Sequence, residues 1–250
     1  MNLNDLVKKT IESRPPRILI HGDGGMGKSS LAAAAPAPLF IDIEDGLSEI
    51  DTTALPHPET FEDVMAQLRM VFSEEHEYKT LVVDSADWLE TLLNKDVCKK
   101  ENKKSISDFG YGAGFQIVHE KFQQIIKALT EISKKKEMAI IILCHSQIKE
   151  YKNPLSENFD CYRLKMRDKN SELFTEFSTL VGFLHTKIFV NKEDKGFSSQ
   201  TKAIGGSQRI LDCMPHAAFT AKNRYNITES IELPNPQKGW ENLINAIKGE

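Results

Sequence analysis

The feature that most restricts the fold of this chain is a glycine-rich octapeptide, which reads Gly22-Asp-Gly-Gly-Met-Gly27-Lys28-Ser29. It satisfies the pattern G-x-x-x-x-G-K-[ST] at every fixed position. An apolar run that predicts a buried strand, Ile18-Leu-Ile20, precedes it, and the helix-forming residues 29–35 follow it. In that context the pattern is typical of a phosphate-binding loop, because backbone N–H groups and a helix N-terminus can surround phosphate oxygens.

This loop predicts that the chain binds ATP together with Mg²⁺. The side chain of Lys28 can reach the β- and γ-phosphates, and the hydroxyl of Ser29 can be a ligand of Mg²⁺. Hydrolysis of ATP is therefore the predicted chemistry. The predicted nucleotide-binding residues are Gly22, Asp23, Gly24, Gly25, Met26, Gly27, Lys28, Ser29 and Ser30.

Around the loop, apolar runs alternate with segments of helical spacing. Strands that are almost continuously apolar and alternate with helices predict an α/β fold, with a mainly parallel central sheet that helices flank on both faces. The predicted strands cover residues 39–43, 80–83 and 138–144, and the predicted helices cover residues 60–72, 88–93 and 115–136.

The C-terminal third has a different pattern. Beyond Gln147 the chain is polar, has one helical segment near residues 171–177, and then has short β-like runs that predict antiparallel strands. These runs cover residues 180–190, 199–204 and 218–233. The chain has 250 residues, of which 40% are hydrophobic, so we expect one domain, residues 1–250, with residues 1–16 as a short N-terminal helix and lead-in.

A carboxylate that could position Mg²⁺ follows the apolar run Thr80-Leu-Val-Val83. Asp84 ends this run, as the Walker B carboxylate ends its strand, and could hold the hydration shell of the metal. Many strands also end in an aspartate that caps the next helix, but here Ser85 or Asp87 could supply that cap. We therefore predict Ser29 and Asp84 as the metal-site residues.

Hydrolysis also needs a group that orients or deprotonates water. Glu44 ends the strand that follows the loop helix and could reach the γ-phosphate side, with Asp42 and Asp45 as alternatives. His145, Ser146 and Gln147 directly follow the apolar run at residues 138–144, and a polar side chain there could sense the γ-phosphate. Lys28, Glu44, His145 and Gln147 are therefore candidate catalytic residues.

These motifs together resemble the RecA superfamily, and specifically the phage-encoded RecA-like proteins that act as ATP-dependent single-strand annealing recombinases. The resemblance covers nearly the whole chain. It rests on residues 39–47, on Gln147-Ile-Lys149, on Phe109-Gly-Tyr-Gly-Ala-Gly114 and on Ala221-Lys222-Asn223-Arg224-Tyr225. It implies a RecA-like P-loop NTPase domain.

The resemblance also implies roles for individual residues. It implies that Glu44 activates water, that Gln147 senses the γ-phosphate, and that Lys222 and Arg224 reach the nucleotide of a neighbouring subunit. The predicted assembly is then a homo-oligomer, a ring or a filament, with nucleotide at the subunit interfaces. A single-strand-binding protein is a further implied partner.

Single-stranded DNA is the predicted macromolecular ligand. The net charge of -4 provides no global positive field, so any contact with DNA must be local. Two stretches, residues 99–115 and 149–169, combine basic and aromatic side chains, which can neutralise phosphates and stack on bases. We therefore predict a DNA-dependent ATPase that promotes annealing or pairing of strands.

An alternative function is a nucleotide-switched adaptor or helicase loader that acts on a protein partner. An AAA+ protein is less favoured, because it would append a helical lid where this chain continues with β-like runs. No apolar run approaches the roughly 20 residues that span a bilayer, so we expect no membrane partner. The expected location is the cytoplasm, that of a bacterial host if the chain is phage-encoded.

Overall fold

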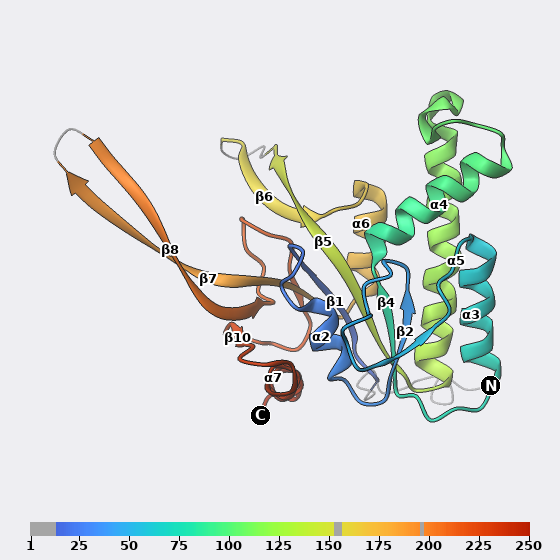
Figure 1. The fold of residues 1–250 in the computed structure, drawn as a ribbon, viewed down its shortest axis with the longest axis horizontal. Helices are drawn as coiled ribbons and strands as arrows, with labels where there is room; N and C mark the ends of the chain where they lie inside the picture. The colour runs from blue at the N-terminus through green and yellow to red at the C-terminus, as the bar shows by residue number, and fades with distance from the viewer. Residues whose placement is uncertain (1–13, 153–156, 196–197) are drawn as a thin grey trace, which may run out of the picture.

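The computed structural model describes residues 14–152, 157–195 and 198–250, and for residues 188–195 and 198–205 it describes the backbone (Figure 1). Most of the predicted N-terminal helix and lead-in, residues 1–16, lies outside the described residues. Within the described ranges no helix is long and apolar enough to cross a membrane.

One large sheet forms the centre of the molecule, with the strand order β10-β8-β7-β1-β5-β4-β2-β3. The pairs from β7 through β1, β5, β4 and β2 to β3 are all parallel. This confirms the predicted α/β fold with a mainly parallel sheet. The strands are β1 (Arg17–Gly22), β2 (Pro38–Asp42), β3 (Thr53–Leu55), β4 (Thr80–Asp84), β5 (Ala139–Tyr151), β7 (Leu180–Lys195), β8 (Ser198–Asp212) and β10 (Ile231–Glu232).

Antiparallel pairs lie toward the C-terminus, as predicted, but β7 is an exception. It pairs in parallel with β1 through Leu180 to Leu184, and only then joins β8 in a long antiparallel hairpin. Its first half is therefore part of the parallel core. Much of the run at residues 218–233 is not strand, because it contains only β9 (Lys222–Asn223) and β10.

Helices cover both faces of the sheet. Consecutive residues of a strand point to opposite faces, so Val82 packs in one core while Leu81 and Val83 pack in the other. The larger core lies under α3 (Phe61–Ser73), α4 (Ala86–Lys100), α5 (Ala113–Lys135) and α6 (Asp168–Phe177). The smaller core lies under α2 (Lys28–Ala33) and the C-terminal α7 (Pro236–Lys248), which begins at an Asn235 cap followed by proline.

Two hairpins extend beyond the helix-covered part of the sheet (Figure 1). One is β7–β8. The other forms because β5 continues past the predicted end at Cys144 to Tyr151, where it pairs with β6 (Phe159–Leu164). The described residues of the predicted basic and aromatic stretch 149–169 thus lie largely in the β5–β6 hairpin and at the start of α6.

Candidate functional site

The predicted phosphate-binding loop connects β1 to α2 at the carboxyl end of the parallel strands. Gly22 ends β1 so close to β7 that a Cβ atom here would lie 2.3 Å from the carbonyl oxygen of Leu184. Gly27 has a φ of 90°, in the left-handed region, directly before α2 begins at Lys28. Both positions therefore require glycine for backbone reasons, and the loop has the shape that the motif predicts.

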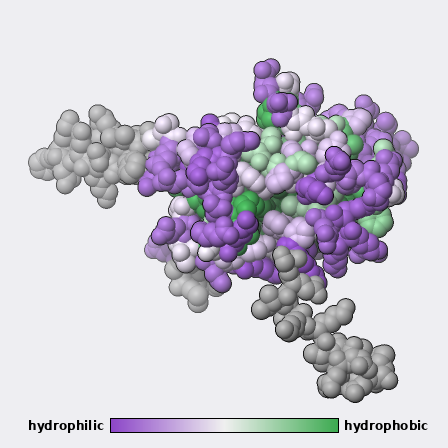
Figure 2. All heavy atoms as spheres, turned by 90° about the horizontal axis from the view of Figure 1, so that it is seen from below, coloured by the Kyte–Doolittle hydropathy of each residue, from purple (hydrophilic) through white to green (hydrophobic). Residues whose placement is uncertain are grey.

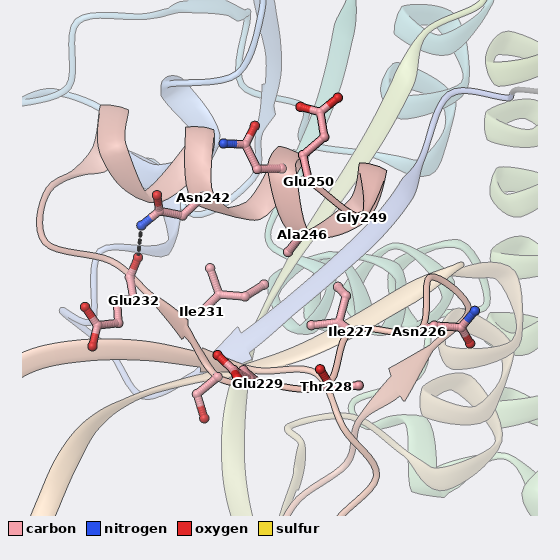
Figure 3. A pocket seen from close by; sticks show the side chains of 12 residues that line it. Asn226, Ile227, Thr228, Glu229, Ile231, Glu232, Asn242, Ala246, Gly249 and Glu250 are labelled. Carbon is pink, nitrogen blue, oxygen red and sulfur yellow. Dashed lines mark hydrogen bonds between the residues drawn. The ribbon is translucent and has the colours of Figure 1, made fainter.

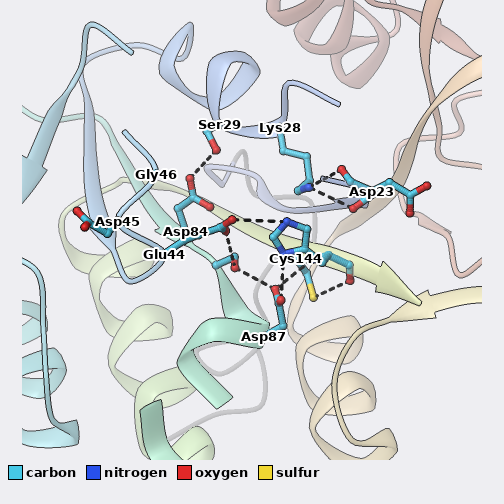
Figure 4. A network of polar contacts seen from close by, with 12 residues as sticks. Asp23, Lys28, Ser29, Glu44, Asp45, Gly46, Asp84, Asp87 and Cys144 are labelled. Atoms are coloured by element: carbon cyan, nitrogen blue, oxygen red, sulfur yellow. Dashed lines mark hydrogen bonds and ion pairs between the residues drawn. The ribbon is translucent and has the colours of Figure 1, made fainter. Parts of the chain in front are cut away.

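Lys28 is buried and curls back over the loop (Figure 4). Its Nζ donates hydrogen bonds to the carbonyl oxygens of Gly22 at 3.1 Å and Asp23 at 2.9 Å. Burial lowers the pKa of the Lys28 ammonium, although the nearby Glu44 and Asp84 carboxylates oppose that shift. An ammonium held by neutral carbonyls can exchange them for phosphate oxygens, which bind it more strongly.

The two predicted metal-site residues meet. Ser29 Oγ donates a hydrogen bond of 2.6 Å to Asp84 Oδ2, because α2 starts beside the end of β4. No group of three or more His, Cys, Asp and Glu that could hold a metal exists in the described part of the chain. One hydroxyl and one carboxylate fit Mg²⁺, which usually keeps several waters and takes few protein ligands beside phosphates. The donor set therefore suits Mg²⁺ bound with ATP.

Asp84 makes this site sensitive to pH. Burial, with further contributions from Glu44 and Asp42, raises the pKa of its carboxyl to about 6, and the Ser29 hydrogen bond only partly opposes this. Below pH 6 a bound proton must leave before the carboxylate can serve Mg²⁺.

We therefore expect the affinity for Mg²⁺, in the presence of ATP, to fall by up to about tenfold per pH unit below pH 6 and to be flat above pH 7. Titration of Mg²⁺ against a fluorescent ATP analogue from pH 5 to pH 8 measures this. An affinity that does not change across that range would contradict the role of Asp84.

Glu44 lies at the centre of a polar network beside the loop (Figure 4). Its Oε2 lies 3.2 Å from the Ser85 hydroxyl oxygen, and its Oε1 lies 3.6 Å from His145 Nε2. The same nitrogen would lie 4.0 Å from a Cβ atom on Gly24, so His145 stands between Glu44 and the loop. The network thus lies directly beside the phosphate-binding loop.

The other two carboxylates of this turn have different environments. Asp42 Oδ1 accepts from the backbone N–H groups of Asp45 at 2.9 Å and Gly46 at 3.4 Å, so it stabilises the turn itself. Asp45 is exposed and has a positive φ of 59°. Of the three candidates, Glu44 is therefore the one that contacts His145 and Ser85.

Asp87 belongs to this network, although the sequence suggested it only as a helix cap. It accepts from the backbone N–H of His145 and contacts His145 Nδ1, both at 3.0 Å, and it accepts from the Ser85 hydroxyl at 2.9 Å. Burial alone raises the pKa of the Asp87 carboxyl, but the His145 hydrogen bonds outweigh it and lower the pKa. Asp87 is thus an ionised group that fixes the orientation of His145 toward Glu44.

We expect the Asp87→Asn variant to lower kcat by about tenfold while ATP affinity is kept, because the amide still accepts from the His145 N–H but no longer orients the ring. Asp87→Ala should also lower the melting temperature, since it leaves the half-buried His145 N–H without its Asp87 acceptor. Steady-state ATPase assays and thermal unfolding separate the two effects. An unchanged kcat in Asp87→Asn would remove Asp87 from the mechanism.

Another residue that the sequence did not single out is Arg209 on β8. Its Nη1 would lie 2.7 Å from a Cβ atom on Gly27, so the guanidinium stands against the loop. No short motif marks Arg209, because only the pairing of β7 with β8 brings it to this place.

Gln147 and Ser146 follow His145 on β5 but face other partners. Gln147 Nε2 donates to the carbonyl oxygens of Leu164 at 3.0 Å and Met166 at 3.4 Å, so its described hydrogen bonds hold the turn before α6. Ser146 Oγ lies 2.8 Å from Nδ1 of His21, the residue before the loop. The structure therefore brings His145, rather than Gln147, next to the phosphate-binding loop.

Lys222 and Arg224 lie at the amino end of the parallel strands, opposite the end that carries the loop. β9 pairs with the start of β7, and the Arg224 N–H donates to the carbonyl oxygen of Thr179, next to the first residue of β1. Five strand residues separate that point from the loop, which corresponds to about 16 Å. Lys222 Nζ donates to the carbonyl oxygens of Thr175 and Glu176 at the end of α6. Neither side chain is near the loop of its own chain.

A separate cavity of about 480 Å³ lies between β10 and α7 (Figure 3). Polar side chains from both elements line it, and Asn242 Nδ2 donates across it to the carbonyl oxygen of Glu232 at 2.8 Å. It contains none of the predicted site residues.

Comparison with known proteins agrees with this geometry. A family model described as an AAA domain matches residues 14–225, well over half of the chain. No curated protein matches the chain. Strands β7 and β8 follow α6, as the sequence predicted, and the described residues there form no helical lid. The family that matches is described as an AAA domain although the chain has strands at that place. The chain therefore belongs to the AAA domain family and is a nucleotide-binding ATPase of the P-loop type.

Proposed function

We propose that this ATPase is an oligomeric, RecA-like protein that binds single-stranded DNA and promotes the annealing or pairing of strands. One observation carries the proposal. Strand β5 runs without interruption from His145, beside the phosphate-binding loop, to Tyr151, in an exposed hairpin that carries basic and aromatic side chains. A single rigid element thus joins the ATP site to a surface that suits DNA.

At the ATP site, the chain's own residues supply orientation and charge. Lys28 and the backbone N–H groups of the loop bind phosphate oxygens, and Ser29 and Asp84 hold Mg²⁺, which when bound neutralises phosphate charge. Glu44, which His145 and Ser85 orient, takes a proton from the attacking water. His145 lies between Glu44 and the loop, where it can respond to the presence of a γ-phosphate.

At the proposed DNA surface, several side chains project into solvent. Ile148 is 63% exposed and Tyr151 39% exposed on the β5–β6 hairpin, and Arg163 lies over the Tyr151 ring at 5.1 Å. In the glycine-rich segment before α5, Tyr111 is fully exposed. Not every cation of the two predicted stretches is available, because Lys149 pairs with Asp168 and Lys100 pairs with Glu62 and Asp96. The aromatic side chains therefore support the proposal better than the net charge does.

The proposed contact between subunits uses the far edge of the sheet. Arg17, Lys134 and Arg224, together with Arg14, line a cavity of about 490 Å³, and none of its described lining residues is acidic. Burial lowers the pKa of Arg17, and the neighbouring Arg224 lowers it further. Arg17, Lys134 and Arg224 gathered in one cavity favour an anion, and a triphosphate on a neighbouring subunit is one. The loop and this cavity lie at opposite ends of the parallel strands. A contact between them is therefore head-to-tail and gives a ring or a filament.

The side of the molecule seen from below in Figure 2 is covered largely by hydrophilic side chains with small hydrophobic patches between them. A contact between subunits on such a face would be mainly polar. Two further features of the proposal, a single-strand-binding protein as a partner and action in the cytoplasm of a bacterial host, rest on the RecA-like resemblance alone.

We expect Arg224→Ala to reduce ATPase activity strongly while the monomer still binds nucleotide, because Arg224 acts on the neighbour's phosphates. An exposed arginine on α3, Arg69, provides the matched control Arg69→Ala, which should retain activity. A mixture of Arg224→Ala and Lys28→Ala chains should regain activity, since hybrid interfaces combine an intact loop with an intact Arg224. No recovery in the mixture, or full activity of Arg224→Ala alone, would refute action in trans.

The function as a whole is tested by adding single-stranded DNA to the ATPase assay. The proposal expects stimulation that is lost at high salt, because phosphate contacts release counterions. Indifference to DNA at every salt concentration would instead favour an adaptor or helicase loader that acts on a protein. Electron microscopy with an ATP analogue, with and without DNA, then distinguishes a ring from a filament.

A further inference from the structure

A hollow of about 570 Å³ lies between the β5–β6 hairpin and the segment that follows β8. Tyr151, Phe159 and Arg163 line it from the hairpin, and His216, Phe219 and Thr220 line it from the other side. None of its described lining residues is acidic. We call this space the hairpin hollow.

Aromatic rings form the walls of the hairpin hollow. On one wall the rings of Tyr151 and Phe159 lie 5.2 Å apart, with the Arg163 guanidinium over Tyr151. On the other wall the exposed His216 ring stacks on Phe219 at 4.9 Å and 17°, and Phe219 stacks on Phe183 at 5.0 Å and 24°. The nearly parallel His216 and Phe219 rings on one wall, and the Arg163 guanidinium on the other, suit a planar, hydrogen-bonding ring carried by a phosphate chain.

One wall of the hollow is connected to the ATP site through His21. The ring of His21 is completely buried on β1, directly before the first glycine of the phosphate-binding loop, and contacts Phe183 at 5.1 Å. Its Nε2 lies 2.7 Å from the carbonyl oxygen of Thr220, which can only accept, so Nε2 carries the proton. Its Nδ1 therefore accepts from Ser146 Oγ at 2.8 Å, on the strand that presents His145.

His21 keeps these roles across the working pH range. Burial lowers the pKa of its imidazole to about 4, although the hydrogen bond to Thr220 opposes the shift, so the ring is neutral at pH 7. A neutral ring with one donor and one acceptor can make both hydrogen bonds, to Thr220 and to Ser146, at once. A displacement of Thr220 would therefore move the His21 ring, and with it β1 and the hydrogen bond to Ser146.

We propose that the hairpin hollow binds one base of single-stranded DNA and that His21, a positioning residue, transmits its occupancy from Thr220 to Ser146 and so to the adjacent His145, beside the phosphate-binding loop. The proposal rests on the proposed DNA-binding function and adds the site and the route of coupling. The base stacks on the aromatic walls, and Arg163 contacts an adjacent phosphate.

Tyr151→Ala tests the binding site, with labelled oligo-dT and fluorescence anisotropy as the measurement. Affinity should fall by about 5- to 100-fold, as for the loss of one stacking partner, and Tyr151→Phe should restore it. Phe72→Ala, which removes a similarly exposed ring on α3, is the matched control and should bind DNA like the wild type. Equal affinity of Tyr151→Ala and wild type would overturn the binding site.

Ser146→Ala and His21→Gln test the coupling. Ser146 is only partly buried, so its loss should leave the fold intact, and glutamine at position 21 can still donate toward Thr220. Ser146→Ala should bind oligo-dT like the wild type but lose most of the DNA stimulation of ATPase, and His21→Gln should lose less. Full stimulation in Ser146→Ala would overturn the route through His21. If the wild type itself binds no DNA, the proposed function fails. If the wild type binds DNA and Tyr151→Ala binds it equally well, only the hairpin hollow fails.

Discussion

We expect Lys28→Ala to abolish ATP hydrolysis. Lys28 is the cation that the fold buries inside the loop, and its ammonium is held by two carbonyl groups that phosphate oxygens can replace. Removal of one such charge-stabilising donor from a site commonly costs about 10²–10³ in kcat, and here it also weakens binding of the triphosphate. Phosphate release at saturating ATP and Mg²⁺ measures the loss.

The matched control for this variant is Lys238→Ala. Lys238 is a surface residue of α7 that pairs with Glu241, so its removal should leave turnover and the melting temperature almost unchanged. Lys28→Ala should also remain folded, because water can hydrate the carbonyl groups of Gly22 and Asp23. Normal turnover in a folded Lys28→Ala protein would remove the loop from the mechanism.

The second large effect is expected for Glu44→Gln, which should keep ATP binding and lose turnover by about 10²–10⁴-fold. Glutamine has the shape of glutamate and can still contact Ser85 and His145, but it cannot accept a proton from water. Binding of a fluorescent ATP analogue and single-turnover hydrolysis separate the two properties.

Asp45→Asn is the control for Glu44→Gln, because Asp45 is the adjacent carboxylate and is exposed. It should hydrolyse ATP like the wild type. If Glu44→Gln retains its rate, the general base must be another residue, and the network around Asp87 and His145 is the place to look for it. A loss in both variants would instead indicate an effect of charge on the whole turn.

The sequence alone determined the parts of this protein that depend on neighbours along the chain. The loop at residues 22–29 follows from a local pattern, because the glycines, the lysine and the start of the helix are consecutive. The parallel sheet follows from apolar runs that alternate with amphipathic helices, and Asp84 follows from its place at the end of such a run. Since parallel strands end at one edge, the meeting of Ser29 with Asp84 was also predictable.

The tertiary structure decided which distant residues meet. Asp87 orients His145, Arg209 stands against Gly27, and His21 contacts Thr220, and each pair is far apart in sequence. It also decided that β7 joins the parallel core and that Arg224 lies far from its own loop. Local patterns specify elements and their buried faces, but strand order and register decide these contacts. They depend on how all the elements pack at once, which no single segment encodes.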